Sequence, residues 1–308
     1  MSDLQPCVVC DSADFEPLKS VSWNFTGLGA LNVTFGICKD CGHVSQDPFP
    51  TSELITAFYE QNVNYYEPDY NMELPAEPVS TRRRILALAR RFKPEMGTVL
   101  EIGCGSGENL HYFKQEGWDA YGCEPSFQSG KQAQTRIGED KITIGFADDA
   151  LVSNMKYDVV FSSHVLEHVT DPKKMFGQIV NSAKDDGIVI VEVPCTRQPE
   201  RLSPGWLALE HLTYFSAGGI TRMAEDAGLQ VIETVMDDEY HLYPAVCIVC
   251  RKPCADTKNE LTYFNEYAQN RHCVAEFLKK DAKHWADVGS RIAEFDDIYL
   301  WGAGNHTA

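Results

Sequence analysis

Hydrophobic and polar positions follow a regular pattern over the middle of the chain. Five short apolar runs predict buried strands, at residues 98–103, 120–125, 142–147, 157–166 and 187–194. The stretches between and around them carry apolar residues at helical spacing and predict helices at 80–92, 109–117, 129–138, 171–186 and 218–228. Strands and helices that alternate at this spacing are typical of a parallel sheet covered on both faces. The sequence therefore predicts an α/β fold with a doubly wound sheet.

The flanking regions show different patterns. Residues 1–50 combine two cysteine pairs with short strand-like runs, and 51–60 look like a short helix capped by Thr51 or Ser52. Residues 61–79 are polar and rich in proline and tyrosine, as in a linker or lid. After the sheet, 229–252 predict a hairpin, 257–292 a helical region, and 297–308 a strand with a glycine turn. We expect four parts: 1–50, 51–79, 80–256 and 257–308.

Composition and charge narrow the possible partners and compartments. The chain has 308 residues and a net charge of −18, from 27 basic and 45 acidic residues. This balance disfavours a nucleic-acid partner, which needs a basic surface. We also expect no membrane span, since no apolar run approaches the roughly 18 residues that one requires. The N-terminus shows no secretory signal, so eleven cysteines favour a reducing, cytoplasmic location.

A glycine-rich loop follows the first central strand, in VLEIGCGSGENL (residues 99–110). Strand-to-helix loops at this position bind ligands in open α/β sheets. The loop departs from the dinucleotide fingerprint because Glu108 stands where the last glycine should be. Glu101 and Glu108 disfavour an anion, and Glu124, about twenty residues on, can accept both hydroxyls of a ribose. This combination suits a positively charged sulfonium nucleoside.

These segments, together with FADD at 146–149 and YDVVFSSHVLEHV at 157–169, resemble class I S-adenosylmethionine-dependent methyltransferases. The resemblance covers about residues 80–250 and implies a Rossmann-like methyltransferase sheet. It implies that three glycines line the methionine moiety, that Glu124 holds the ribose, and that Asp148 or its neighbour Asp149 contacts the adenine amino group. The expected cofactor-binding residues are Glu101, Gly103, Gly105, Gly107, Glu124, Asp148 and Ser163.

Two Cys-x-x-Cys pairs, 27 residues apart, predict a structural zinc site held by Cys7, Cys10, Cys38 and Cys41. Gly42 suits the tight turn of such a knuckle, and His43 is a possible substitute ligand. Four thiolates leave no open position for substrate or water, so the metal would not act as a Lewis acid. Three further cysteines favour a buried strand over a second metal site: Cys247, Cys250 and Cys254.

Candidate bases follow the fourth and fifth strands. His164 and His168 lie in SSHVLEHV, and Glu210 and His211 lie in LEHLTYFS. Methyl transfer to a hydroxyl or an acidic C–H requires that a proton be removed, and histidine titrates near neutrality. We expect His211 to be the base, aided by Glu210, with His168 as the second candidate.

The whole combination is similar to the nucleotide-sugar C-methyltransferases of deoxysugar and surface-polysaccharide biosynthesis. The resemblance implies that His168, Glu210 and His211 surround the sugar, with a substrate-binding lid tyrosine among Tyr65, Tyr66 and Tyr70. It also implies that residues 257–308 begin a further, incomplete α/β region. The chain departs from that family's pattern at Ala208, where the family has tyrosine, and at YPAVCIV, where it has a glycine-rich motif. Methylation at carbon and at oxygen both stay open.

Other functions fit parts of this pattern. An RNA methyltransferase with a zinc module would need more positive charge, and a nicotinamide-dependent oxidoreductase would need glycine in place of Glu108. A non-enzymatic zinc-ribbon protein would leave the grouped histidines unexplained. A small-molecule O-methyltransferase of another class is a further alternative. The sequence does not identify the sugar, the methylated position, the nucleotide carrier or the oligomeric state.

Overall fold

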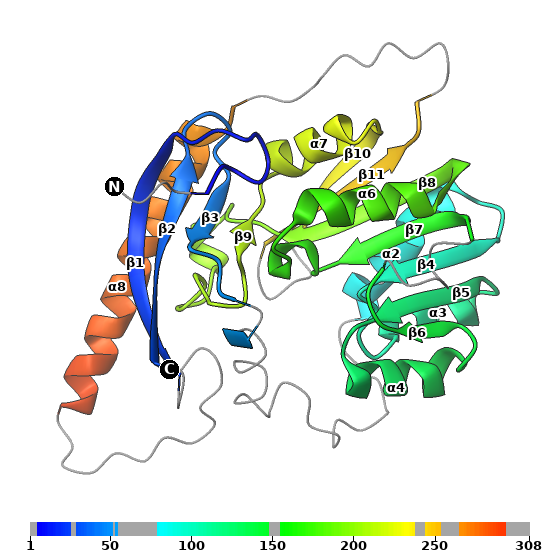
Figure 1. Cartoon of the computed structure of the whole chain (residues 1–308), viewed down its shortest axis with the longest axis horizontal. Coiled ribbons are helices and arrows are strands. Elements are labelled where there is room, and N and C mark those ends of the chain that lie inside the picture. The colour runs from blue at the N-terminus through cyan, green and yellow to red at the C-terminus, as the bar shows by residue number, and fades with distance from the viewer. Residues whose placement is uncertain are drawn as a thin grey trace.

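A computed structural model describes residues 5–25, 29–51, 53–54, 79–147, 155–237, 244–253 and 265–293. Within these residues the chain forms two sheets that lie side by side (Figure 1). The larger sheet has seven strands in the order β10-β11-β8-β7-β4-β5-β6, and the smaller has four in the order β1-β2-β3-β9.

Five strands of the larger sheet run parallel: β4 (Thr98–Ile102), β5 (Asp119–Glu124), β6 (Ile142–Ile144), β7 (Tyr157–Ser163) and β8 (Ala183–Pro194). The predicted late hairpin is confirmed: β10 (Gln230–Asp237) pairs antiparallel with β11 (Ala245–Arg251), which in turn pairs antiparallel with β8. Because the chain order reverses between β4 and β7, the carboxyl ends of these two strands flank a crevice where a ligand can bind.

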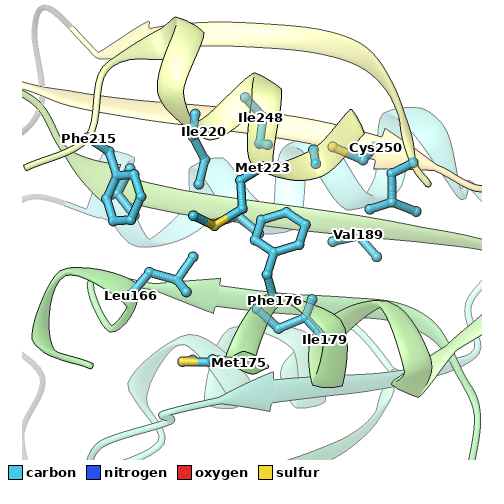
Figure 2. Packing of buried hydrophobic residues seen from close by; sticks show 14 of the residues in the cluster. Leu166, Met175, Phe176, Ile179, Val189, Phe215, Ile220, Met223, Ile248 and Cys250 are labelled. Carbon is cyan, nitrogen blue, oxygen red and sulfur yellow. The ribbon is translucent and has the colours of Figure 1, made fainter. Parts of the chain in front are cut away.

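Helices cover both faces of this sheet, as predicted. One face packs on α2 (Val79–Phe92), α3 (Glu108–Gln115) and α4 (Phe127–Ile137). The other face packs on α6 (Pro172–Ser182) and α7 (Ala217–Asp226). Figure 2 shows the second of these interfaces, where Phe176 and Met223 from the two helices meet Val189 and Ile248 of the sheet. Burial of these apolar side chains holds the helices against the sheet whose carboxyl ends carry the site.

Local signals explain where several helices begin. Pro172 occupies the first turn of α6, and the carboxylate of Asp171 accepts a hydrogen bond from the Lys174 amide at 2.9 Å. The hydroxyl of Ser216 caps α7 in the same way, accepting from the Gly219 amide at 3.1 Å. Thr51 accepts from the Leu54 amide at 3.3 Å, which fits the predicted cap there, although most of 51–60 lies outside the described residues.

Several boundaries differ from the prediction by a few residues, and the clearest difference lies between α6 and β8. The helix expected over 171–186 ends at Ser182, and β8 begins at Ala183 rather than at 187. Ala183 pairs with Tyr157 of β7, so the last residues expected for the helix belong to the strand instead. The exposed residues Asp185 and Asp186 gave this stretch the polar look of a helix end.

The smaller sheet consists of β1 (Phe15–Phe25), β2 (Gly29–Cys38), β3 (Val44–Asp47) and β9 (Thr213–Tyr214), all antiparallel. A helix of 26 residues, α8 (Tyr267–Ile292), lies along it (Figure 1). Phe35 and Ile37 of the sheet pack with Val274 and Phe277 of the helix. The described part of 257–308 thus joins the N-terminal sheet, while the expected strand and glycine turn at 297–308 lie outside the described residues.

Two short 3-10 helices complete the described chain, η2 (Leu166–His168) and η3 (Pro199–Arg201). Among the residues that the structure describes, no helix has the length and apolar content needed to cross a membrane.

Candidate active site

The glycine loop sits at the carboxyl end of β4, between the strand and α3. Gly103 has φ +76°, and a Cβ there would lie 2.4 Å from a methyl carbon of Val165, so only glycine fits. A Cβ at Gly105 would meet no described atom within 4 Å, so this side of the loop is open. Gly107, with φ +77°, forms the N-cap of α3. The loop therefore offers open space bordered by backbone.

Glu124, at the end of β5, holds this loop in place. Its Oε2 accepts a hydrogen bond from the Gly105 amide at 2.9 Å, and its Oε1 accepts from the Ser126 amide at 2.8 Å. Burial raises the pKa of Glu124 above its usual value, although these two amides counteract the effect. Each oxygen keeps a lone pair, so the carboxylate can still accept the two hydroxyls of a ribose.

Glu101, the last charged residue of β4, is buried beneath the same loop with 2 % of its surface exposed. Its Oε1 accepts a hydrogen bond from the side-chain amide of Asn109 at 2.7 Å, whereas Oε2 is buried without a hydrogen-bond partner among the described residues. Burial, with Glu124 and Glu108 nearby, raises the pKa of Glu101 well above its usual range. A positively charged ligand group would satisfy this oxygen and its charge.

The carboxylates of Glu101 and Glu124 and the open glycine loop fit S-adenosylmethionine. An acidic group without a partner suits the amino group of a methionine moiety, and the open loop at Gly105 leaves room for the chain that carries it. The expected adenine contacts, Asp148 and Asp149, lie outside the described residues.

Beyond β7 and β8, polar side chains form a connected group. Ser163 donates a hydrogen bond to Glu192 Oε1 at 2.9 Å, and the Nε2 atom of His164 lies 3.3 Å from the same oxygen. Glu192 is buried within β8 and also forms an ion pair with Arg84 of α2. Ser163 and His164 therefore share one carboxylate oxygen of Glu192.

The structure brings His168, Glu210 and His211 together, although they come from two segments. The Nδ1 atom of His168 lies 2.8 Å from the main-chain carbonyl oxygen of Glu210, and the imidazole rings of His168 and His211 are 4.9 Å apart. The amide of Leu212 also donates to the carbonyl oxygen of Glu167 at 2.8 Å. These bonds fix η2 against the segment that precedes β9.

Aromatic rings line the other side of His211. The rings of Trp206 and Tyr214 lie 5.6 Å and 5.7 Å from its imidazole. The Tyr214 hydroxyl accepts a hydrogen bond from the Ala208 amide at 2.9 Å and donates to the Trp206 carbonyl at 3.1 Å. The segment 206–214 is thus folded back on itself, and it carries His211 in a fixed position. The expected lid tyrosines Tyr65, Tyr66 and Tyr70 lie outside the described residues.

The four cysteines of the predicted zinc site lie together at one end of the smaller sheet. Cys7 and Cys41 have sulfur atoms 3.6 Å apart, and Cys10 and Cys38 have sulfur atoms 3.4 Å apart. All four sulfurs lie within 4.8 Å of one another, as four ligands of one metal ion require. The amide of His43 donates to the Cys41 sulfur at 3.4 Å, and its imidazole packs on Phe215 at 5.1 Å rather than joining the cluster.

Several residues of the site escaped the sequence analysis. Asn109 and Arg84 sit on helices, where amide and basic side chains give no specific signal. Glu192 did give one, because a carboxylate stands inside the apolar run GIVIVEVP and must have a buried partner. Glu167 lies in the same motif as His164 and His168, where the two histidines give the stronger signal for a base. By contrast, Cys247 and Cys250 are fully buried in β11, as expected for a strand.

Comparison with known proteins identifies the family to which this fold belongs. A family model described as a methyltransferase domain matches residues 73–234, just over half of the chain. "Methyltransferase OMS1, mitochondrial" of Saccharomyces cerevisiae is 24% identical over 267 residues, 73% of this chain and 53% of that protein. A ubiquinone biosynthesis O-methyltransferase of Caulobacter vibrioides is 30% identical over 99 residues, and "C-methyltransferase NovU" of Streptomyces niveus is 25% identical over 140. These cover 30% and 44% of this chain, and 39% and 33% of the relatives.

The chain thus spans about half or less of the length of these relatives. Two solved structures share its fold. The 1,6-didemethyltoxoflavin-N1-methyltransferase of Burkholderia thailandensis, bound to S-adenosylhomocysteine, aligns with a TM-score of 0.52 at 12% identity, over 72% of this chain and 96% of its own. The magnesium protoporphyrin IX methyltransferase of Synechocystis, bound to S-adenosylmethionine, gives 0.50 at 16%, over 67% and 100%.

Proposed function

This chain belongs to the methyltransferase domain family, and from that premise we propose that it is an S-adenosylmethionine-dependent methyltransferase that methylates a sugar or nucleotide-sugar at carbon or oxygen. In this proposal Glu101, the glycine loop and Glu124 hold the cofactor, and Ser163 borders it. S-adenosylmethionine supplies a methyl group on a positively charged sulfur, so it needs an acceptor held close and stripped of a proton.

The single observation that carries the acceptor proposal is the grouping of His168, Glu210 and His211 beyond β7 and β8. In our proposal His211 removes the proton from the acceptor. Trp206 and Tyr214 fix its ring, and Glu210 is buried beside it. In this proposal Glu210 acts on the substrate rather than directly on its neighbour. The match to C-methyltransferase NovU supports this reading, and the lid tyrosines Tyr65, Tyr66 and Tyr70 are proposed to close on the substrate.

A direct test is a methyl-transfer screen against a panel of nucleotide-sugars, with products identified by mass spectrometry. We expect a mass gain of one methylene on at least one member. General-base help is worth about 10²–10⁴ in rate, so His211→Ala should lose about that much in kcat. The same variant should bind S-adenosylmethionine almost normally. Near-native turnover of His211→Ala on the true acceptor would remove His211 from the base role.

A second candidate is O-methylation of a small molecule other than a sugar. It is favoured by the relatives named ubiquinone biosynthesis O-methyltransferases. Product from a phenolic acceptor panel, with none from nucleotide-sugars, would select this candidate. An RNA substrate is disfavoured by the net charge of −18, and a salt-titrated RNA-binding assay would reveal it.

We further propose that Cys7, Cys10, Cys38 and Cys41 bind one structural zinc ion. Three of these side chains are buried, and all four sulfur atoms lie within 4.8 Å of one another, as coordination of one ion requires. Gly42 supports the site because its φ is +79° and a Cβ there would lie 2.7 Å from the backbone at the start of α8. The knuckle and the last helix therefore pack directly on each other.

The proposed location is the cytoplasm, because a cysteine-rich chain keeps its thiols in a reducing compartment. One named relative is mitochondrial, so the compartment has to be measured by fractionation of the source cells. Co-purification of the chain with an organelle would overturn this proposal.

A further inference from the structure

The acceptor side of the crevice contains a buried carboxylate to which the proposed chemistry assigns no role. Glu167 lies in η2 and has 2 % of its side chain exposed. Neither carboxylate oxygen has a hydrogen-bond partner within normal distance among the described residues. Its Oε1 lies 3.6 Å from Nδ1 of His164 and 3.6 Å from Nε2 of His168. Glu167 is therefore an anion whose neighbours are imidazoles.

Its relation to His168 is defined by a second contact. A main-chain carbonyl oxygen can only accept, so the 2.8 Å bond to Glu210 places a proton on Nδ1 of His168. Nε2 is then the nitrogen that gains or loses a proton, and Nε2 is the atom that faces Glu167. His211 completes the group, because a carboxylate oxygen of Glu167 and ring nitrogens of His168 and His211 all lie within 4.8 Å of one another.

Titratable groups surround Glu167 from several elements. The loop after β7 contributes His164, and η2 itself contributes His168. The segment before β9 contributes Glu210 and His211, and β9 contributes Tyr214. Behind His164 lies the buried pair of Glu192 and Arg84, whose charges compensate each other.

The charge of Glu167 persists despite its burial. Burial would raise its pKa, but His168, His164 and His211 more than offset this and lower the pKa to about 2. The carboxylate is thus ionised at any pH near neutrality. Its position is also rigid, because the adjacent Leu166 is fully buried in the cluster of Figure 2, close to Phe215.

We infer that Glu167 is the positioning residue of the acceptor site, which orients His168 and balances the positive charge that the histidine pair gains during methyl transfer. The inference rests on the proposed function. The acceptor's O–H or C–H electron pair forms the bond to the methyl carbon, the carbon–sulfur bond breaks onto sulfur, and the proton moves to an imidazole nitrogen. One positive charge leaves the sulfur and one appears on the imidazole, 3.6–4.8 Å from Glu167.

This arrangement differs from the one expected from sequence, where Glu210 was to aid the base. The structure links Glu210 to His168 through its main-chain carbonyl, while the side chain of Glu167 faces both rings. The carboxylate that compensates the imidazoles therefore comes from the loop after the fourth strand.

The test compares the wild-type chain with Glu167→Gln and Glu167→Asp by NMR titration of isotope-labelled histidines. Loss of an opposite charge at this distance moves a titration midpoint by about 1 pH unit or more. We expect the midpoint of the His168 signal to fall in Glu167→Gln and to recover in part in Glu167→Asp, which keeps the charge. Glu225→Gln, a buried carboxylate of α7 away from the site, should leave the midpoints unchanged.

Kinetics provide the second readout. Glu167→Gln should reduce kcat about 10²-fold and move the acidic inflection of the pH profile to lower pH, with S-adenosylmethionine affinity unchanged. That affinity, measured by calorimetry, also shows that the variant is folded.

Unchanged histidine midpoints in a folded Glu167→Gln chain would overturn the inference. A shift of the same signals in the wild-type chain on adding a chelator would also overturn it, because the three residues would then be metal ligands. The titration needs no acceptor. An acceptor screen without product would therefore contradict the proposed function and leave the result on Glu167 intact.

Discussion

At the scale of single residues, four carboxylates at the carboxyl edge of the sheet, three buried and one half-buried, differ in what faces them. Glu124 accepts two backbone amides, and Glu192 faces a guanidinium. Glu167 faces imidazoles, and Glu101 keeps one oxygen without a partner among the described residues. The first two are compensated within the protein, whereas Glu101 keeps an oxygen that a cationic ligand group can satisfy, and Glu167 is proposed to balance the charge of the histidines.

Replacement of Glu124 tests the ribose contact. Glu124→Ala removes the acceptor for two ribose hydroxyls and releases the amide of Gly105. We expect S-adenosylmethionine binding to weaken by ~2–3 kcal/mol, the cost of leaving buried polar groups unpaired. Calorimetry measures this, with Glu116→Ala, an exposed residue that pairs with Arg90, as the control. Unchanged affinity in Glu124→Ala would remove this residue from the site.

Glu101 makes stability depend on pH. The pKa of Glu101 in the folded protein lies above the value of about 4.3 in the unfolded chain. Glu101 therefore contributes fully to stability below about pH 4.3. This contribution is lost as the pH rises through the pKa of the folded protein. Glu101→Gln should therefore gain about 1 kcal/mol or more in unfolding free energy at pH 8 without ligand, and less near pH 4. Urea unfolding at both values, with the exposed Glu139→Gln as control, decides this.

The same variant should bind S-adenosylmethionine more weakly, because the negative partner of the cationic ligand is gone. A Glu101→Gln chain that lost stability at pH 8, or bound the cofactor as well as wild type, would contradict this account.

Residues differ in how far sequence can reveal them. Glu124 could be found because its spacing from the glycine loop follows from strand, helix and strand lengths. The role of Glu167 could not, because it depends on a segment 43 residues away that folds back through Tyr214 and places His211 beside it. Such a contact follows from tertiary packing and leaves no periodic signal.

At the scale of elements, α8 connects three parts of the described chain. Glu266, just before the helix, is buried and forms an ion pair with Arg197 at 2.7 Å. Its other oxygen accepts from the Gly218 amide at 2.7 Å, at the start of α7. A carboxylate suits this place because the first amides of a helix lack partners. One residue thus joins α7, α8 and the loop after β8.

Loss of this carboxylate should be costly. Glu266→Gln removes the charged partner of Arg197, which keeps its bond to the side chain of Gln269, and weakens the cap of α7. We therefore expect about 2 kcal/mol lower unfolding free energy. Glu276→Gln is the matched control on the same helix, since Glu276 is exposed and pairs only with a neighbouring turn through Lys279. It should change stability by less than about 0.5 kcal/mol. Equal effects of the two changes in urea unfolding would refute the role of Glu266.

Element types were predictable where periodicity was strong, as in the central sheet. The packing partner of α8 was not predictable. Its apolar positions fit the N-terminal sheet as well as they would fit a sheet formed by residues after the helix. The boundary error at Ser182 has a similar cause, since Ala183 already pairs with Tyr157 although the polar residues after it suggested a helix end.

At the scale of the whole molecule, the segment 206–214, which carries His211, is joined to the cysteine cluster through the smaller sheet. β9 follows His211 by two residues and pairs with β3, which begins three residues after Cys41. A single strand pair therefore separates the cysteine cluster from the segment that carries His211.

The zinc proposal is tested on the intact chain. We expect one zinc ion per chain in protein purified without chelator, because the four thiolates couple metal binding to folding. Elemental analysis of Cys10→Ser should show less metal, while Cys273→Ser, a half-buried cysteine of α8 outside the cluster, should keep it. Metal-free wild-type protein, with all four thiols reactive, would refute the site.

The long helix also affects the order in which the chain folds during synthesis. Arg271 pairs with Glu16, 255 residues earlier, and α8 covers apolar residues of β2. Ribosomes add about 5–20 residues per second. The helix that covers β1 and β2 is therefore synthesised on the order of 10–50 s after these strands. During that time Phe35 and Ile37 lack their final partners. We expect nascent chains halted before residue 265 to be cleaved readily by protease within β1 and β2, and full-length chains to resist.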